Sequence, residues 1–137
     1  KTYRAIAYTC GRPLASEGKL VDYIVKDAVG GARIVAAGQK GAKRAELYYR
    51  CLDRREDRTL LQITLLTGRH HQIRAQLAKV GAPLLGDLRY GSKESINYSR
   101  EKEIRMVQLQ AVRLCFTHPS TKERVCYELD QALALAF

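Results

Sequence analysis

The chain has 137 residues, of which 46% are hydrophobic, and its formal net charge is +10 at pH 7. This length corresponds to one ordinary domain, and the hydrophobic content is too high for a wholly disordered chain. No apolar run reaches the roughly 20 residues of a membrane-spanning helix, so we expect no membrane partner.

The first half of the chain has the pattern of antiparallel strands. Residues 2–8 are rich in β-forming residues, and shorter strands are expected at 20–25 and 33–37. The odd-numbered residues of 44–52 are apolar and alternate with mostly polar ones, which predicts a strand with one buried face. After a polar turn, residues 59–66 are apolar on both faces, so we expect a hairpin whose second strand is central to a sheet.

A short helix is expected from His71 onward, because Ile73, Leu77 and Val80 recur at helical spacing. Gly81, followed by a proline two residues later, is a typical C-terminal signal. The helix follows the central strand directly. Its first turn carries unpaired N–H groups that could hold an anion.

The rest of the chain is predicted to contain a second hairpin. Residues 91–103 are polar and are expected to form a mobile connector, and residues 106–117 a strand with a β-bulge near Ala111. Residues 124–129 return as its partner strand, and 130–137 are expected to form a short helix. The fold class predicted for 1–137 is a single α+β domain, a mainly antiparallel mixed sheet with a few short helices.

The basic charge is concentrated in residues 1–100, which hold 19 Lys and Arg against 9 Asp and Glu, whereas residues 101–137 hold 5 of each. Such an excess suits a polyanionic partner, although a hydrated basic surface without a partner is the alternative. The densest basic cluster consists of Lys40, Lys43 and Arg44, with two glycines nearby. We expect it to form a flexible loop that contacts phosphates.

Cysteine and histidine spacing argues against metal binding. The four cysteines show no C-x-x-C spacing and are expected to be reduced and structural, as in a cytoplasmic protein: Cys10, Cys51, Cys115 and Cys126. Adjacent residues on a helix point about 100° apart, so His70 and His71 cannot bind one metal as an i, i+4 pair would. Hydrolase, dinucleotide-binding and Walker motifs do not occur in the sequence.

The stretch LLTGRHHQIRAQLAKVGAPLLGDLRYG, residues 65–91, resembles a motif of the RluA-type RNA pseudouridine synthases. That motif reads L-x-T-G-R-x-H-Q-I-R, then a short apolar helix, then G-x-P-(I/L)-x-G-D-x-x-Y-G. KTYRAIA resembles the family's K-x-Y segment, and LQAVRLCFTHPSTKE resembles its late L-H-A-x-x-L-x-F-x-H-P turn, with Gln110 in place of the usual histidine. The resemblance covers nearly the whole chain.

The resemblance implies an isomerase that converts uridine to pseudouridine in structured RNA, ribosomal or transfer, without a metal or organic cofactor. In that family an aspartate attacks a flipped-out uridine, and the freed uracil rejoins the ribose through C5. By motif, Arg74 resembles the arginine that pairs with this aspartate, and Tyr3 the tyrosine that packs on the base and is proposed to assist proton removal from C5. The RNA contacts expected from the motif and the basic cluster are Arg69, His71, Gln72, Lys40, Lys43 and Arg44.

The family's nucleophile lies in H-R-L-D-x-x-T-S-G, ahead of the K-x-Y segment, and this motif does not occur in the 137 residues. Asp87 lies in the G-D-x-x-Y-G motif, where we expect it to bind local backbone in a turn. We therefore expect an incomplete catalytic domain that begins after the nucleophile motif, through a cloning boundary, proteolysis or a split gene. Alone it is expected to be inactive, with Arg74 unpaired at the edge of the core.

Three functional classes remain open. The chain is part of a pseudouridine synthase, or a non-catalytic basic RNA-binding module of the same fold, or a structural domain whose basic face meets only solvent. The ordered motifs disfavour the third class. The first two differ in whether the gene encodes an H-R-L-D segment upstream of Lys1, and the sequence indicates neither the target uridine nor the oligomeric state.

Overall fold

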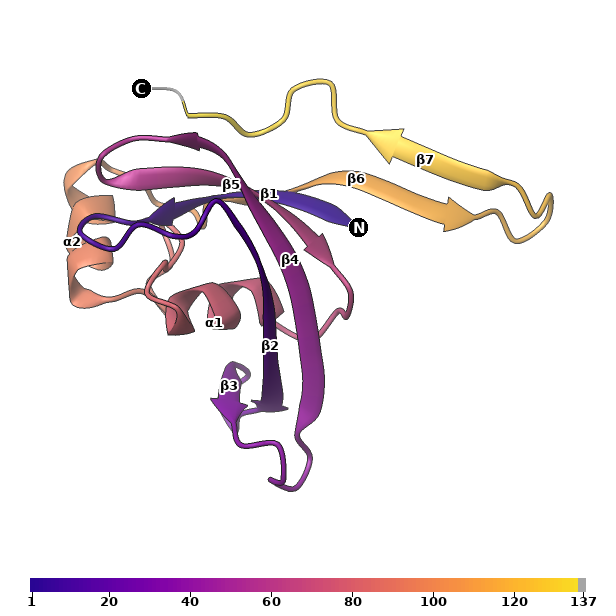
Figure 1. Cartoon of the computed structure of the whole chain (residues 1–137), viewed down its shortest axis with the longest axis horizontal. Helices are drawn as coiled ribbons and strands as arrows, with labels where there is room; N and C mark the ends of the chain where they lie inside the picture. Colours follow the sequence, from indigo (N-terminus) through magenta and orange to yellow (C-terminus); the bar gives the residue numbers. More distant parts are fainter. Residues whose placement is uncertain (136–137) are drawn as a thin grey trace.

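The computed structural model describes residues 1–135, which form seven strands and two helices (Figure 1). The strands are β1 (Thr2–Tyr8), β2 (Glu17–Lys26), β3 (Ala32–Val35), β4 (Lys43–Arg54), β5 (Arg58–Leu65), β6 (Leu109–Thr117) and β7 (Arg124–Glu128). The helices are α1 (Gln72–Lys79) and α2 (Lys93–Glu101), and neither is long and apolar enough to cross a membrane. One antiparallel sheet in the order β3-β2-β4-β5-β1-β6-β7 confirms the predicted α+β class.

The predicted hairpin of β4 and β5 forms the middle of this sheet. Alternate residues of β4 face the core, with Ala45 and Leu47 fully buried, as the alternation predicts. β5 lies between β4 and β1, and its Leu61 and Ile63 are also fully buried. The apolar character of β5 therefore reflects its central place.

Helix α1 packs one apolar side against this central part of the sheet. Ile73 and Leu77 belong to the same buried cluster as Leu61 and Ile63, and Figure 1 shows α1 beneath the strands. Gly81 adopts φ +82°, a left-handed conformation that favours glycine and ends the helix as predicted. Ile73, near the start of α1, packs in this cluster with residues of β1, β4 and β5.

Two of the predicted elements are wrong. Within the expected mobile connector, residues 93–101 form α2, whose first turn is capped by Ser92 accepting from the Ser95 N–H at 3.1 Å. Residues 93–101 show no apolar residues at helical spacing on a buried face, because the residues that α2 buries are serines. Ser99 Oγ, for example, accepts from the Gly86 N–H at 2.9 Å. The expected C-terminal helix is absent from residues 130–135, where the Leu133 N–H instead donates to Gln110; residues 136–137 lie outside the described residues.

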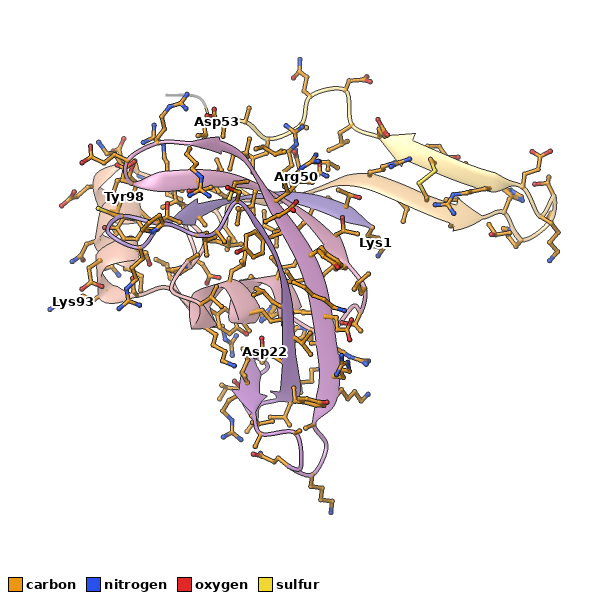
Figure 2. The ribbon with its side chains drawn as sticks, viewed as in Figure 1. Lys1, Asp22, Arg50, Asp53, Lys93 and Tyr98 are labelled. Atoms are coloured by element: carbon orange, nitrogen blue, oxygen red, sulfur yellow. A yellow bond between two sulfur atoms is a disulfide. The ribbon has the colours of Figure 1, made fainter. Side chains whose placement is uncertain are left out.

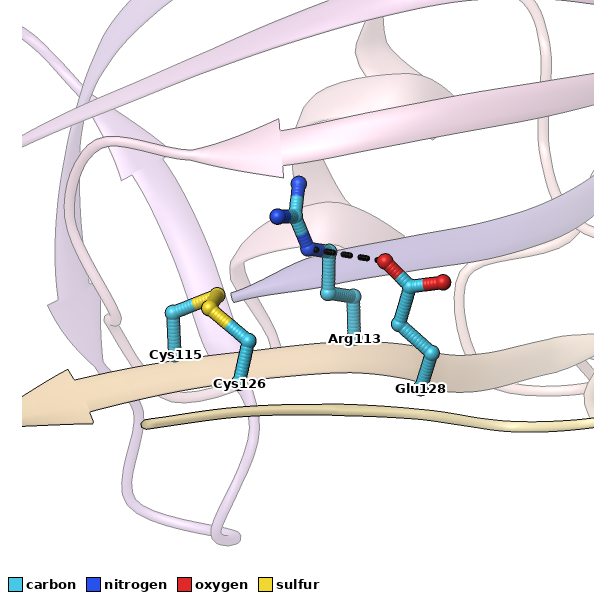
Figure 3. Close-up of a disulfide and its surroundings, with 4 residues drawn as sticks. All are labelled: Arg113, Cys115, Cys126 and Glu128. Atoms are coloured by element: carbon cyan, nitrogen blue, oxygen red, sulfur yellow. Dashed lines mark ion pairs between the residues drawn. A yellow bond between two sulfur atoms is a disulfide. The ribbon is translucent and has the colours of Figure 1, made fainter. Parts of the chain in front are cut away.

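Strands β6 and β7 form a hairpin that extends away from the rest of the molecule (Figure 1). The predicted bulge is present, since the register between β1 and β6 shifts between Ala111 and Arg113. Cys115 and Cys126 lie directly opposite each other and form a disulfide, beside the ion pair of Arg113 and Glu128 (Figure 3). The expectation that all four cysteines are reduced is therefore wrong, because strand register brings this pair together.

Candidate active site

A pocket of about 190 Å³ opens where β1, β5 and β6 meet the start of α1. It brings together five residues that the sequence singled out, namely Tyr3, Arg69, His71, Gln72 and Arg74. The remaining lining is apolar and comes from Leu65, Ile73 and Leu109. The pocket is smaller than the roughly 300–1,000 Å³ of most small-molecule sites and is open on one side, so it suits one planar ring attached to a larger molecule.

Arg74 forms a two-point ion pair with Asp87. Its Nε donates to Asp87 Oδ2 at 2.8 Å and one Nη to Oδ1 at 2.9 Å, and the Asp87 side chain is 0% exposed. The guanidinium also lies over the ring of Tyr90, 5.0 Å from its centroid. The expectation of an unpaired Arg74 is therefore wrong: its partner lies within the chain, 13 residues away.

Asp87 is held by backbone as well as by Arg74. Its Oδ1 accepts the N–H groups of Arg89 and Tyr90 at 3.0 and 3.1 Å, which confirms the expected turn. Burial by itself raises the pKa of Asp87, but Arg74 and these two amides outweigh burial and hold the pKa below its ordinary value. Asp87 is therefore an anion at neutral pH, and it fixes the position of Arg74.

His71 contacts Arg74 from the other side. It adopts φ +53°, and its Nε2 accepts from Arg74 at 3.2 Å because a guanidinium can only donate. Its Nδ1 then carries the proton and donates to the Tyr90 hydroxyl at 2.7 Å. Burial, followed by the nearby charge of Arg74, lowers the pKa of His71, so the ring is neutral at pH 7.

Side-chain hydrogen bonds of Gln72 stabilise the loop that precedes α1. Its side-chain oxygen accepts from the Thr67 hydroxyl at 2.8 Å and from the Arg69 N–H at 2.9 Å, while its nitrogen donates to the Glu46 carbonyl at 3.0 Å. Gln72 is only 2% exposed. These bonds position Arg69, whose Nε donates to the Arg44 carbonyl at 2.9 Å.

The predicted basic loop divides into two parts. Lys40 lies in the exposed turn between β3 and β4, whereas Lys43 and Arg44 are the first residues of β4. Arg44 forms an ion pair with Glu46, which also binds Lys19 at 3.3 Å. Of this cluster, Lys43 lines a second pocket together with Arg69, so the structure brings the loop next to the start of α1.

Sequence reasoning placed Asp87 in a turn but missed its bond to Arg74, and it gave Tyr90 no contact with His71. The motif placed both residues close together in the sequence, but the direction that the chain takes after Gly81 depends on how the turn packs, so local pattern gave no signal for either contact. Among the described residues, no group of three or more His, Cys, Asp or Glu side chains could hold a metal ion.

Comparison with known proteins decides the family. The family model described as RNA pseudouridylate synthase matches residues 1–79. The chain belongs to the RNA pseudouridylate synthase family. Its RluA-type motifs agree with this membership, and the pocket that contains Tyr3 and Arg74 lies within the matched segment except for Leu109.

Two curated relatives from bacteria are named as ribosomal large subunit pseudouridine synthases. Ribosomal large subunit pseudouridine synthase D of Buchnera aphidicola subsp. Baizongia pistaciae is 36% identical over 129 residues, which is 89% of this chain and 39% of that protein. Ribosomal large subunit pseudouridine synthase C of Rickettsia conorii is 35% identical over 73% of this chain and 33% of that protein. The chain thus spans less than half the length of these relatives.

A solved structure confirms the fold. Human RNA Pseudouridylate Synthase Domain Containing 1 superposes with a TM-score of 0.74, covering 95% of this chain and 54% of that one, at 21% sequence identity. At this identity the likeness establishes the pseudouridine synthase fold, whereas the family rests on the sequence matches.

Proposed function

We propose that this chain supplies the base-binding pocket of an enzyme that isomerises uridine to pseudouridine in large-subunit ribosomal RNA. The observation that carries the proposal is the pocket of about 190 Å³ that Tyr3 and Arg74 line together. The names of the curated relatives, which are ribosomal large subunit synthases, support ribosomal over transfer RNA. The excess of basic residues in 1–100 suits the polyanionic substrate.

Tyr3 and Arg74 take different roles in this proposal. The half-buried ring of Tyr3 stacks on the flipped uracil, and its hydroxyl assists removal of the C5 proton after the new C–C bond has formed. Arg74 has five N–H groups, of which three are bonded to Asp87 and His71 in the described structure. Its other two N–H groups can bind a second carboxylate, so Arg74 orients a nucleophilic aspartate without leaving Asp87.

That nucleophile comes from outside these 137 residues, because no aspartate in them lies in the family's H-R-L-D context. The chain alone is therefore inactive, and the reaction needs the full-length gene product. In that product the aspartate displaces uracil from C1′ of the ribose, the uracil turns, and C5 bonds to C1′ as the aspartate leaves. The C5 proton is lost and N1 gains one, so no redox cofactor is needed, and the cytoplasm, where ribosomes are made, is the expected location.

A second candidate is a non-catalytic RNA-binding module of the same fold. The ion pair of Arg74 with the fully buried Asp87 favours it, because this arginine then has a structural role in the absence of any nucleophile. The same pocket would then bind a base without altering it.

Conversion of uridine in a large-subunit ribosomal RNA transcript separates the two candidates. Nucleoside analysis by chromatography and mass spectrometry should detect pseudouridine with the full-length product and none with residues 1–137 alone. Tyr3→Phe in the full-length product should keep RNA affinity within about twofold and lower the single-turnover rate by roughly 100-fold or more. No conversion by the full-length product would favour the RNA-binding module, and equal loss of affinity and rate would make Tyr3 structural.

A further inference from the structure

A second pocket of about 280 Å³ adjoins the first, and Arg69 lines both of them. It lies between the end of β2, the start of β3, the start of β4 and the loop that precedes α1. We call it the flanking pocket. Among its lining residues, only Arg69 has a role assigned through the family motif. Lys43 was predicted to contact phosphates only as a member of the basic cluster.

The wall of the flanking pocket is basic. Lys26, Lys43, Arg69 and His70 contribute to it, and no carboxylate is among its lining residues in the described structure. Two of these side chains are fixed in place. Arg69 is held through the Arg44 carbonyl, and His70 donates to the Gly30 carbonyl at 2.7 Å. Because these groups are already positioned, an anion binds there at a smaller entropic cost.

The floor of the flanking pocket is apolar. Ile24 and Ala32, which are 4% and 7% exposed, form it from neighbouring strands. An apolar floor accepts the face of a base, and cations at the rim accept phosphate oxygens. A nucleotide has both a base for the floor and a phosphate for the rim, whereas a free phosphate would contact only the rim.

We propose that the flanking pocket binds the nucleotide next to the flipped uridine, its base on Ile24 and Ala32 and its phosphate on Lys26, Lys43 and Arg69. This inference rests on the proposed function, because the shared Arg69 places the two pockets one side chain apart. It also gives Arg69 a specific role: its guanidinium meets the phosphate that joins the two nucleotides. The pocket is then part of the site that selects the RNA sequence around the target.

The test measures binding of a fluorescent heptaribonucleotide with a central uridine to the chain by anisotropy, between 50 and 200 mM KCl. Lys26→Ala/Lys43→Ala should flatten the slope of log affinity against log salt by roughly 0.7, the contribution of the one single-strand phosphate that the two lysines help to neutralise. Lys93→Ala/Lys102→Ala removes the same charge at the two ends of α2 and should leave the slope unchanged. Figure 2 shows Lys93 at the left edge of the molecule, well away from Asp22 of β2. Equal slopes in the two variants would overturn the proposal.

A photo-crosslink locates the base independently of any variant. A heptamer with 4-thiouridine beside the central uridine, on either side in turn, should crosslink from one side to peptides containing residues 24–32 or 68–70. Crosslinks confined to α2 or to the β6–β7 hairpin would contradict the flanking pocket. Millimolar inorganic phosphate should not displace the heptamer, and full displacement would reduce the pocket to a phosphate site.

Failure of this inference is distinguishable from failure of the proposed function. If the full-length product forms pseudouridine but Lys26→Ala/Lys43→Ala leaves the salt slope unchanged, only the flanking pocket is refuted. If the slope flattens and the crosslinks map to the pocket while no pseudouridine forms, RNA binding stands and the catalytic assignment falls.

Discussion

Replacing Arg74 by methionine should destabilise the chain. The sequence alone gives the opposite expectation, because an arginine without a partner at the core edge is better replaced by an apolar residue. In the structure, Asp87 would keep the N–H bonds from Arg89 and Tyr90 but would lose both bonds from the guanidinium. A carboxylate that is 0% exposed would then lack its counter-charge.

Breaking a buried ion pair by removing one partner costs about 3–5 kcal/mol. The lower end of this range applies here, because the Arg74 side chain is 19% exposed and water can reach the gap it leaves. A loss of about 3 kcal/mol is a large share of the roughly 5–15 kcal/mol that stabilises a domain. It corresponds to a fall in Tm of roughly 10 °C for a chain of this size.

The loss of unfolding free energy caused by Arg74→Met should depend on pH. Burial tends to raise the pKa of Asp87, but Arg74 and the backbone amides outweigh burial, so the folded pKa lies below the unfolded value of about 4. A lowered folded pKa stabilises the fold above the unfolded pKa, and this contribution is lost as the pH falls through the folded pKa. Arg74→Met removes a group that lowers the pKa of Asp87, so the folded variant takes up a proton at higher pH than the folded wild type. The difference between the two proteins should therefore be largest near pH 7 and should shrink as falling pH protonates Asp87, first in the variant and then in the wild type.

Urea unfolding of residues 1–137 at pH 7 measures the effect, with Asp87→Asn as the matched background. Asparagine keeps an acceptor for the two backbone N–H groups but has no charge to leave unpaired. Arg74→Met should therefore cost at least about 1 kcal/mol less in the Asp87→Asn background than in the wild type. A loss below about 1 kcal/mol in the wild type, or equal losses in both backgrounds, would refute the ion pair.

Two further predictions concern the turn after α1 and the β6–β7 hairpin. Gly86→Ala should destabilise the chain by more than about 1 kcal/mol in urea unfolding, because φ is +80° and the new Cβ would overlap the Met106 carbonyl oxygen. Gly38→Ala meets no atom within 4 Å and should change stability by less than about 0.5 kcal/mol; similar losses at both positions would contradict this reasoning. Thiol titration in denaturant without reductant should find two reactive groups, rising to four after reduction, whereas four from the start would exclude the Cys115–Cys126 disulfide.

The sheet could be predicted from the sequence because its signals are local. Ala45 and Leu47 alternate with exposed residues along β4, and β5 is apolar on both faces, so each strand's own pattern indicates its place. The start and end of α1 were predictable for the same reason, since helical spacing and Gly81 lie within a few residues of each other. Helix α2 gave no such signal, because the side chains it buries are serines rather than apolar residues.

The partners of the site residues could not be predicted from local patterns. Cys115 and Cys126 meet only because the β6–β7 register sets them opposite each other, and one step of register would place them on different faces. Arg74 and Asp87 meet because the chain turns back after α1, which depends on how the turn packs. The family motif located these residues, but the contacts between them required the structure.

These contacts also explain why so many polar residues begin an apolar helix. The left-handed conformation of His71 turns it toward Arg74 and Tyr90, while His70 bonds to the Gly30 carbonyl outside the helix. Most of the polar side chains at this point therefore bind one another and the surrounding backbone. That binding fixes Arg74 with two N–H groups to spare. Substitution of Tyr90, which does not line the pocket, should therefore alter the orientation of Arg74 without removing any lining residue, whereas substitution of His71 changes both.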